Sequence, residues 1–167
     1  VVAEGTLAGT APATETFLQV DPSVQVSWNH HDGDTLALGA VFGVAHGSLR
    51  AVLGAERTAL NFLCHCSGIA TTTKRFVRAA RGQARIRDTR KTTPGLRALE
   101  KAAVRAGGGF NHRESLSDAV LIKDNHLVSL GILAAVERCR MRWPGRTVEV
   151  ACDTMEQVAE AKRANAA

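Results

Sequence analysis

The chain has 167 residues, of which 45% are hydrophobic, and a formal net charge of +5. This length is enough for one domain with its own core or for parts of two domains. The charge is uneven, because residues 1–49 hold five acids and no Lys or Arg. A basic chain can bind nucleic acid, but only 4% of the residues are aromatic and no basic run or nucleic-acid motif occurs. We therefore expect no nucleic-acid partner.

The four cysteines are too few for a disulfide scaffold. Cys64-His65-Cys66 lies in a predicted helix, where residues two apart face different directions, and zinc ligands are spaced more widely. We therefore expect reduced thiols, no metal site and a cytoplasmic protein. No targeting sequence or membrane-length apolar run is visible, which predicts no membrane partner. The first residue is Val1, and we expect the chain to be a fragment lacking both ends.

The first third of the chain alternates short strands with helices. The pattern predicts strands at 1–9, 25–28 and 35–44, a helix at 11–17 and a turn at 32–34. Ser48 can cap the next helix, and Ser67-Gly68 is expected to break it before a second helix at 69–80. The expected apolar stripe of the helix that begins after Ser48 consists of Leu49, Val52, Leu53, Leu60 and Leu63. Arg57 lies in its middle, where a surface ion pair is the usual structural role.

The rest of the chain predicts a β/α alternation. Strands are expected at 84–87, near 109–111, at 119–122 and at 147–151. Thr93-Pro94 should open a helix that the Gly107-Gly108-Gly109 run ends. Further helices are expected at 132–140 and after the Thr154 capping box, with a turn at Pro144-Gly145 between them.

Cationic residues follow the predicted strands. In parallel α/β folds the carboxyl ends of strands converge on one face, where ligands bind. Arg90, Lys91 and Lys123 follow strands, whereas His112 and Arg113 precede one. A charge pair after a strand is often a solvated loop, but a helix N-terminus beside Thr89–Thr92 would add anion-binding N–H groups. The pattern therefore predicts a pocket for a polyanionic small molecule.

Four sequence blocks also carry a family resemblance. ERTALNFLCHCSGIAT (56–71), DTRKTTPGLR (88–97), GGGFNHR (107–113) and DAVLIKDNH (118–126) resemble quinolinate phosphoribosyltransferases. The resemblance implies an α/β fold, with residues 1–81 forming part of an N-terminal α/β sandwich domain with its connecting helices. Residues 82–167 would form the first part of an α/β barrel, left incomplete because closure needs about eight strands.

The same resemblance implies a reaction. The family transfers phosphoribosyl from phosphoribosyl pyrophosphate to quinolinate with decarboxylation, giving nicotinate mononucleotide for NAD biosynthesis. Quinolinate carboxylates would be held by Arg90, His112, Arg113 and, from a partner subunit, Arg57. Lys91 and Lys123 would serve the phosphoribosyl donor and the developing charge as catalytic residues, and Thr89 would line the site. Mg²⁺ is expected with the donor, and a homodimer or higher homo-oligomer with shared active sites is expected.

One position departs from the family pattern. The family reads VEVEVDT where this chain has residues 148–154, and Ala151 replaces the second Glu, which helps to bind Mg²⁺ and the sugar. Glu149 faces the same side but lies roughly 6–7 Å back along the strand. We therefore expect the 167-residue chain to lack useful activity. The alternatives are a related phosphoribosyltransferase, the molybdenum-transport-associated homologue, or a catalytically silent anion-binding relative.

Overall fold

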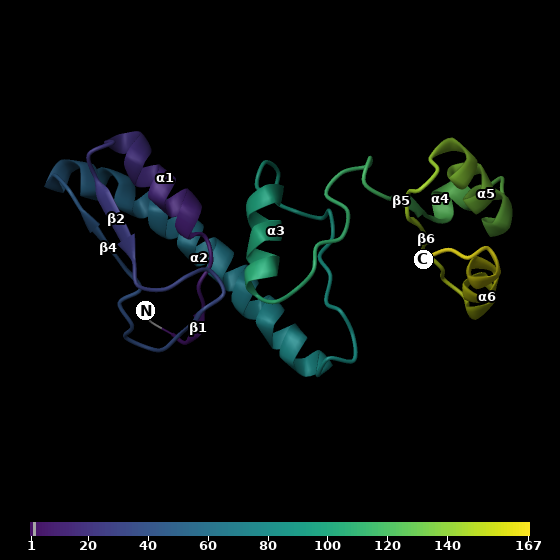
Figure 1. The fold of residues 1–167 in the computed structure, drawn as a ribbon, viewed down its shortest axis with the longest axis horizontal. Coiled ribbons are helices and arrows are strands. Elements are labelled where there is room, and N and C mark those ends of the chain that lie inside the picture. The colour runs from purple at the N-terminus through teal and green to yellow at the C-terminus, as the bar shows by residue number, and fades with distance from the viewer. Residues whose placement is uncertain (2) are drawn as a thin grey trace. The chain divides into compact units, whose positions relative to one another are not determined.

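The structure is a computed structural model that describes residues 1 and 3–167. The chain divides into two compact units, Val1–His112 and Arg113–Ala167 (Figure 1). The elements of the first unit are β1 (Gly5–Thr6), α1 (Thr10–Val20), β2 (Gln25–Trp28), β3 (Thr35–Leu36), β4 (Gly43–His46), α2 (Leu49–Ala80) and α3 (Arg97–Ala106). Those of the second are β5 (Val120–Ile122), α4 (Asp124–Leu127), α5 (Ile132–Arg142), β6 (Val148–Val150) and α6 (Met155–Arg163). No helix in these described ranges is long and apolar enough to cross a membrane.

The N-terminal half of the first unit packs short antiparallel strands against two helices. β1 pairs with β3, and β2 pairs with β4, while α1 lies along α2 (Figure 1). The expected helix, the strand at 25–28 and the turn at 32–34 are confirmed. The expected strands at 1–9 and 35–44 are shorter than predicted. The turn is tied to α1, since the Asp32 carboxylate accepts hydrogen bonds from the backbone N–H groups of Gly9 and Thr10.

Helix α2 runs without interruption for 32 residues, so the expected break at Ser67-Gly68 is wrong. Ser48 caps the helix, as predicted, by accepting a hydrogen bond from Ala51 N–H. The Ser67 hydroxyl bonds to the backbone of Ala8, accepting from its N–H and donating to its carbonyl. A glycine inside a helix costs only about 1 kcal/mol relative to alanine, which packing along the whole helix outweighs.

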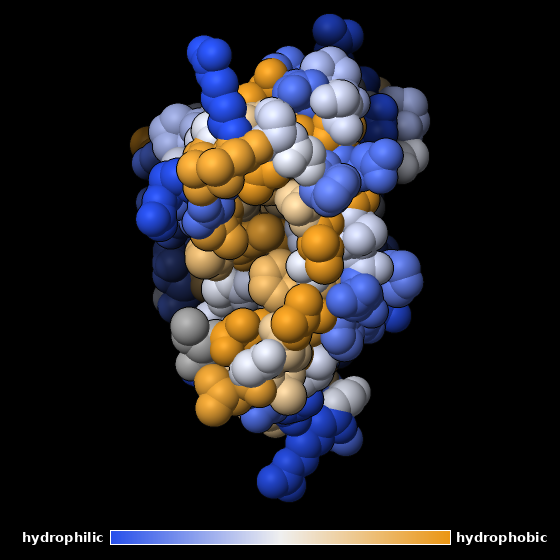
Figure 2. Space-filling model, turned by 90° about the vertical axis from the view of Figure 1, so that its left-hand side faces the viewer, coloured by the Kyte–Doolittle hydropathy of each residue, from blue (hydrophilic) through white to orange (hydrophobic). Residues whose placement is uncertain are grey.

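The buried face of α2 is built mostly from small residues. The expected apolar stripe is confirmed for Val52, Leu60 and Leu63, which pack in or against the core, and wrong for Leu49 and Leu53. Its buried positions are Ala51, Ala55, Ala59, Leu63, Cys66, Ala70 and Thr73. Leu49 and Leu53 are 75% and 59% exposed instead. Small side chains let α1 approach α2 closely, while Leu49 and Leu53 face outward. Figure 2 shows apolar side chains gathered around a hollow on this end of the first unit, over β2, β4 and the adjoining helix ends.

The segment between α2 and α3 is less regular than predicted. The expected strand at 84–87 is reduced to a single parallel bridge between Arg87 and Phe110. Helix α3 begins at Arg97 and not at Thr93-Pro94, because Gly95 has a φ of +80° that a helix cannot accommodate. The residues after Thr93 form a turn instead, closed by a hydrogen bond from Leu96 N–H to the Thr93 carbonyl.

The glycine run ends α3, as predicted, and also lets it touch α2. A Cβ at Gly107 would lie 2.4 Å from the Ala70 carbonyl oxygen, and one at Gly109 would lie 2.8 Å from the Thr73 methyl. These contacts exclude larger residues there, so close packing between α2 and α3 explains two of the three glycines.

The second unit is a small β/α unit. β5 pairs in parallel with β6 in the register Val120–Val148 to Ile122–Val150, as a β/α alternation requires. Helices α5 and α6 cover a core formed by Ile122, Ile132, Ala135, Val136, Val148, Ala161 and Ala164. The expected helix at 132–140, the strand at 147–151 and the Thr154–Gln157 capping box are confirmed to within two residues.

Candidate functional site

Three of the predicted site residues share one loop of the first unit. Thr89, Arg90 and Lys91 follow Asp88 directly, and the Thr89 hydroxyl accepts a hydrogen bond from Lys91 N–H, which turns the chain back. Thr89 and Lys91 are exposed, whereas Arg90 is half-buried. The Arg90 Nε is buried and has no hydrogen-bond partner among the described residues. A buried charged donor without a partner is costly, so this atom favours an anionic ligand.

The loop is fixed on its far side by Glu100 of α3. One Glu100 oxygen accepts a hydrogen bond from Thr93 N–H, and the other lies 3.0 Å from His65 Nε2 on α2. Burial would raise the pKa of Glu100, but hydrogen bonds from Thr93 and His65 outweigh it and hold the pKa below its ordinary value. The ionised carboxylate therefore joins both helices to the cationic loop, and it occupies the N–H of Thr93, where the sequence had predicted a helix to begin.

The side chain of Asp88 holds His112 beside the same loop. The backbone N–H of His112 donates to Asp88 Oδ1 over 2.8 Å. The ammonium group of Lys101 donates to the same oxygen over 2.6 Å. The structure thus brings His112 to the end of the segment that carries Thr89, Arg90 and Lys91.

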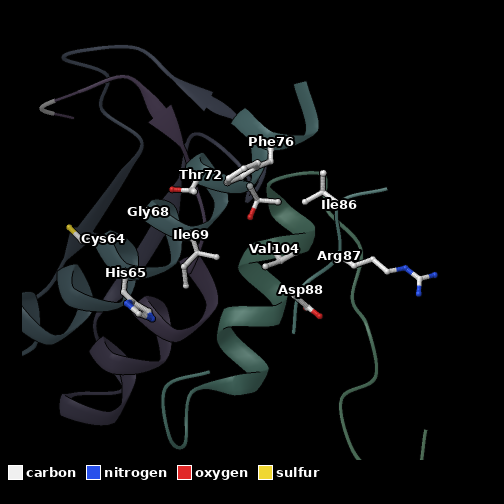
Figure 3. Close-up of a pocket in the computed structure, with 11 residues that line it drawn as sticks. Cys64, His65, Gly68, Ile69, Thr72, Phe76, Ile86, Arg87, Asp88 and Val104 are labelled. Atoms are coloured by element: carbon white, nitrogen blue, oxygen red, sulfur yellow. The ribbon is translucent and has the colours of Figure 1, made fainter. Parts of the chain in front are cut away.

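A cavity of the first unit with an apolar lining lies next to this loop. It has a volume of about 740 Å³ and is lined by α2, α3 and residues 86–88. In Figure 3, Ile69 and Phe76 on α2 and Val104 on α3 surround it, while the Arg87 side chain extends away. Thr89, Arg90 and Lys91 are not among its lining residues, so it differs from the anion pocket that the sequence predicts.

In the second unit, Lys123 lies at the carboxyl edge of the parallel strand pair. Lys123 follows Ile122, and Ala151 follows the paired Val150, with a hydrogen bond from Ala151 N–H to the Ile122 carbonyl. The Lys123 side chain is exposed, and its backbone N–H donates to His126 Nδ1. Ala151 therefore presents a methyl group beside Lys123, where the family pattern has a carboxylate.

Arg113 contributes to a separate cavity of the second unit. Its guanidinium donates to the Ala119 carbonyl over 3.0 Å. It lines a hollow of about 340 Å³ together with His126, Trp143 and Arg146. Arg146, which the sequence reasoning did not single out, adds a second guanidinium to this hollow.

Arg57 is exposed on α2 and does not line the cavity between α2 and α3. Leu49, Leu53 and Arg57 are spaced by four residues, so they share one side of the helix, away from Ala51, Ala55 and Ala59. Arg57 therefore continues an exposed apolar stripe.

The predicted site residues fall in both units. Thr89, Arg90, Lys91 and His112 are brought together in the first, whereas Arg113 and Lys123 belong to the second. Their convergence into one pocket stays a prediction. Sequence reasoning did not assign Asp88, Lys101 and Asn111 to the site. Lys101 lies on a predicted helix, where a lysine side chain is normally exposed. The sequence signal that could have pointed to Asp88 is its place directly before the cationic loop.

Comparisons with known proteins identify both parts of the chain. The family model described as quinolinate phosphoribosyl transferase, N-terminal domain, matches residues 1–67. The model for the C-terminal domain of the same enzyme matches residues 69–167. The two matches meet in the middle of α2, whereas the compact units of the structure meet after His112.

Curated relatives and solved structures agree with these matches. A probable nicotinate-nucleotide pyrophosphorylase (carboxylating) of Bacillus subtilis is 48% identical and aligns with 98% of this chain and 57% of its own length. The corresponding enzyme of Mycobacterium leprae is 48% identical over 80% of the chain and 48% of its own length. The nicotinate-nucleotide pyrophosphorylase structure from Francisella tularensis superposes with a TM-score of 0.95 at 38% identity, covering 99% of this chain and 60% of that one. The chain thus spans less than two thirds of the length of these relatives.

Proposed function

We propose, because the chain belongs to the quinolinate phosphoribosyl transferase family, that the full-length protein containing it transfers phosphoribosyl from phosphoribosyl pyrophosphate to quinolinate. The transfer is followed by loss of carbon dioxide and yields nicotinate mononucleotide for NAD biosynthesis. The observation that carries this proposal is the buried, unpartnered Arg90 Nε within the cationic loop. It is a donor held ready for an anion such as a ring carboxylate.

The chemistry suits a site built from cations. Quinolinate carries two carboxylates, and its ring nitrogen displaces pyrophosphate from the ribose C1 through a cationic, oxocarbenium-like transition state. Arg90, His112, Arg113 and a partner's Arg57 hold the carboxylates in this proposal, while Thr89 lines the site. Lys91 and Lys123 stabilise the phosphoribosyl donor and the departing pyrophosphate. Catalysis then consists mainly of positioning and electrostatic stabilisation.

Mg²⁺, which the resemblance implies, finds no matching ligand set among the residues that the structure describes. No group of three His, Cys, Asp or Glu side chains that could hold a metal occurs within residues 1 and 3–167. The residue beside Lys123 is Ala151, and Mg²⁺ is usually held by one or two carboxylates together with substrate phosphates. We propose that Mg²⁺ accompanies the donor's phosphates, and we assign it no step.

The assembly we propose is a homodimer or higher homo-oligomer with shared active sites. Its support is the exposed apolar surface, which includes Val44, Leu49 and Leu53 and continues into Arg57. Large exposed apolar patches mark interaction surfaces. A partner that covers this stripe would bring Arg57 into the interface. A reducing compartment such as the cytoplasm suits the four free thiols.

The names of both curated relatives favour this function over the alternatives. Each is a carboxylating nicotinate-nucleotide pyrophosphorylase, so a nicotinate phosphoribosyltransferase, a molybdenum-transport homologue and a silent anion-binding protein are less well supported.

The test is a product assay with a matched pair of arginine variants in the full-length protein. Nicotinate mononucleotide should form from quinolinate, phosphoribosyl pyrophosphate and Mg²⁺. Arg90→Ala should weaken quinolinate binding by about 1.5–3 kcal/mol in calorimetry, the scale of a charge-assisted hydrogen bond. Arg138→Ala, at an exposed position on α5, serves as the control and should leave affinity unchanged. No product, or equal affinities in both variants, would refute the assignment.

A further inference from the structure

The paired segments before the cationic loop end in an unusual way. Phe110 N–H donates to the Ile86 carbonyl over 2.8 Å, and Asp88 N–H donates to the Phe110 carbonyl over 3.1 Å. In a continuing parallel ladder, His112 N–H would next donate to the Asp88 carbonyl. It donates instead to the Asp88 side-chain oxygen Oδ1. The carboxylate thus replaces the backbone acceptor, and the ladder stops at this point.

Lys101 completes this arrangement from α3. Its side chain is 1% exposed and its ammonium bonds to Asp88 Oδ1 over 2.6 Å and to the His112 carbonyl over 3.1 Å. Asp88 is 8% exposed, so both charges are nearly withdrawn from water. Such a pair rarely adds stability compared with apolar residues, but it specifies one geometry. Together, Asp88 and Lys101 hold both the N–H and the carbonyl of His112.

Asn111 fixes the second oxygen of the carboxylate. Its amide nitrogen donates to Asp88 Oδ2 and to the Lys101 carbonyl, and its amide oxygen accepts from Arg105. Both oxygens of Asp88 are therefore engaged, and the carboxylate plane cannot rotate freely. Asp88 lies two residues before Arg90 in the chain, so fixing the orientation of Asp88 also fixes the start of the cationic loop.

We propose that Asp88, Lys101 and Asn111 are positioning residues that hold the cationic loop and His112 at a fixed spacing for the two carboxylates of the substrate. This inference rests on the proposed function. A rigid aromatic dicarboxylate needs its cations held in place before it binds, which supporting hydrogen bonds of this kind achieve.

The test compares two variants of the full-length protein in which both buried charges are removed. In Asp88→Asn/Lys101→Met, the asparagine oxygen can still accept from His112 N–H, and methionine fills the space of lysine. In Asp88→Ala/Lys101→Met the charge balance is the same, but that acceptor is gone. The quinolinate dissociation constant should rise about threefold in the first variant, which loses the Lys101 and Asn111 contacts but keeps the acceptor for His112 N–H. It should rise about tenfold further in the second variant, the scale of one lost hydrogen bond. Hydrogen exchange at the His112 amide should accelerate only in the second.

Asn111→Ala gives an independent measurement that leaves no unpaired buried charge. It should raise the dissociation constant by about threefold, because Asp88 Oδ2 loses its partner. Equal quinolinate affinity in all three variants and wild type would overturn the positioning role. If wild type binds no quinolinate, the proposed function fails, and unchanged exchange at His112 in Asp88→Ala/Lys101→Met would overturn the geometric part separately.

Discussion

At the residue scale, single carboxylates organise the candidate site. Asp88 ends one strand pair, Glu100 ties the cationic loop to two helices, and Asp32 caps α1. Each accepts at least two hydrogen bonds, of which at least one comes from a backbone N–H group. A side-chain acceptor satisfies backbone donors where regular structure ends, which is why these acids lie beside loops.

Glu100 makes the stability of the first unit depend on pH. Its pKa lies below the ordinary value of 4.5, so its contribution is complete above pH 4.5 and is lost as the pH falls through the lowered pKa. Glu100→Gln should therefore lower the midpoint of thermal unfolding at pH 7 by a few degrees, and the difference should vanish toward pH 2. Glu137→Gln, at an exposed site on α5, is the control. A difference that is constant with pH would contradict this role.

Ala151 is the residue at which the chain departs from its family pattern beside a candidate catalytic lysine. Ala151→Glu in the full-length protein should lower the Mg²⁺ concentration for half-maximal rate by roughly tenfold, because one carboxylate contact at ~1.4 kcal/mol corresponds to that factor. Ala151→Gln, which has similar size but no charge, should not reproduce the change. An unaltered Mg²⁺ response in the glutamate variant would show that this position has no part in metal binding.

At the element scale, α2 shows what sequence patterns can and cannot predict. Its start at Ser48 follows from capping and was predicted, because a cap depends on a few adjacent residues. Its continuity through Ser67-Gly68 depends on contacts with Ala8, α1 and α3, which are distant in sequence. The predicted strand at 84–87 also depends on a partner distant in sequence, Phe110, and it forms one bridge with that partner instead of a ladder.

Gly68 provides a test of that continuity. It lies in the helix interior, and a Cβ there would meet nothing within 4 Å. Gly68→Ala should therefore increase the free energy of unfolding by about 0.5–1 kcal/mol in denaturant titrations. Gly107→Ala is the opposite control, because its Cβ would lie 2.4 Å from the Ala70 carbonyl oxygen and should destabilise the protein. A destabilising Gly68→Ala would indicate that the helix is interrupted there.

At the scale of the whole molecule, the predicted β/α alternation is confirmed in the second unit, whereas the strand expected before the cationic loop is reduced to one bridge. Short-range signals were sufficient for Thr89–Lys91 and for Lys123, which follow paired segments in the structure. The buried role of Lys101 could not be predicted, because it depends on Asp88 and His112 meeting α3 in three dimensions. Family blocks suggested the candidate site residues, whose roles stay a prediction, and the hydrogen bonds around them became visible only in the structure.

The last prediction concerns the role of Arg57 across subunits. Arg57 continues the exposed Leu49–Leu53 side of α2 and does not line the cavity between α2 and α3, so a partner's active site is its proposed place. Arg57→Ala and Lys123→Ala should each abolish most activity of the full-length protein. In reassembled mixtures, half of the dimers are mixed, and each has one site with both defects and one with neither.

Such mixtures should therefore recover about one quarter of wild-type activity if the protein is a dimer with shared sites. The measurement is nicotinate mononucleotide formation after joint unfolding and reassembly, with sedimentation confirming dimers. Each variant reassembled alone is the control and should stay inactive. If Arg57 served its own subunit, every mixed dimer would carry one defect in each site. Mixtures no more active than the separate variants, or a monomer that turns over at full rate, would show that Arg57 does not act across a subunit boundary.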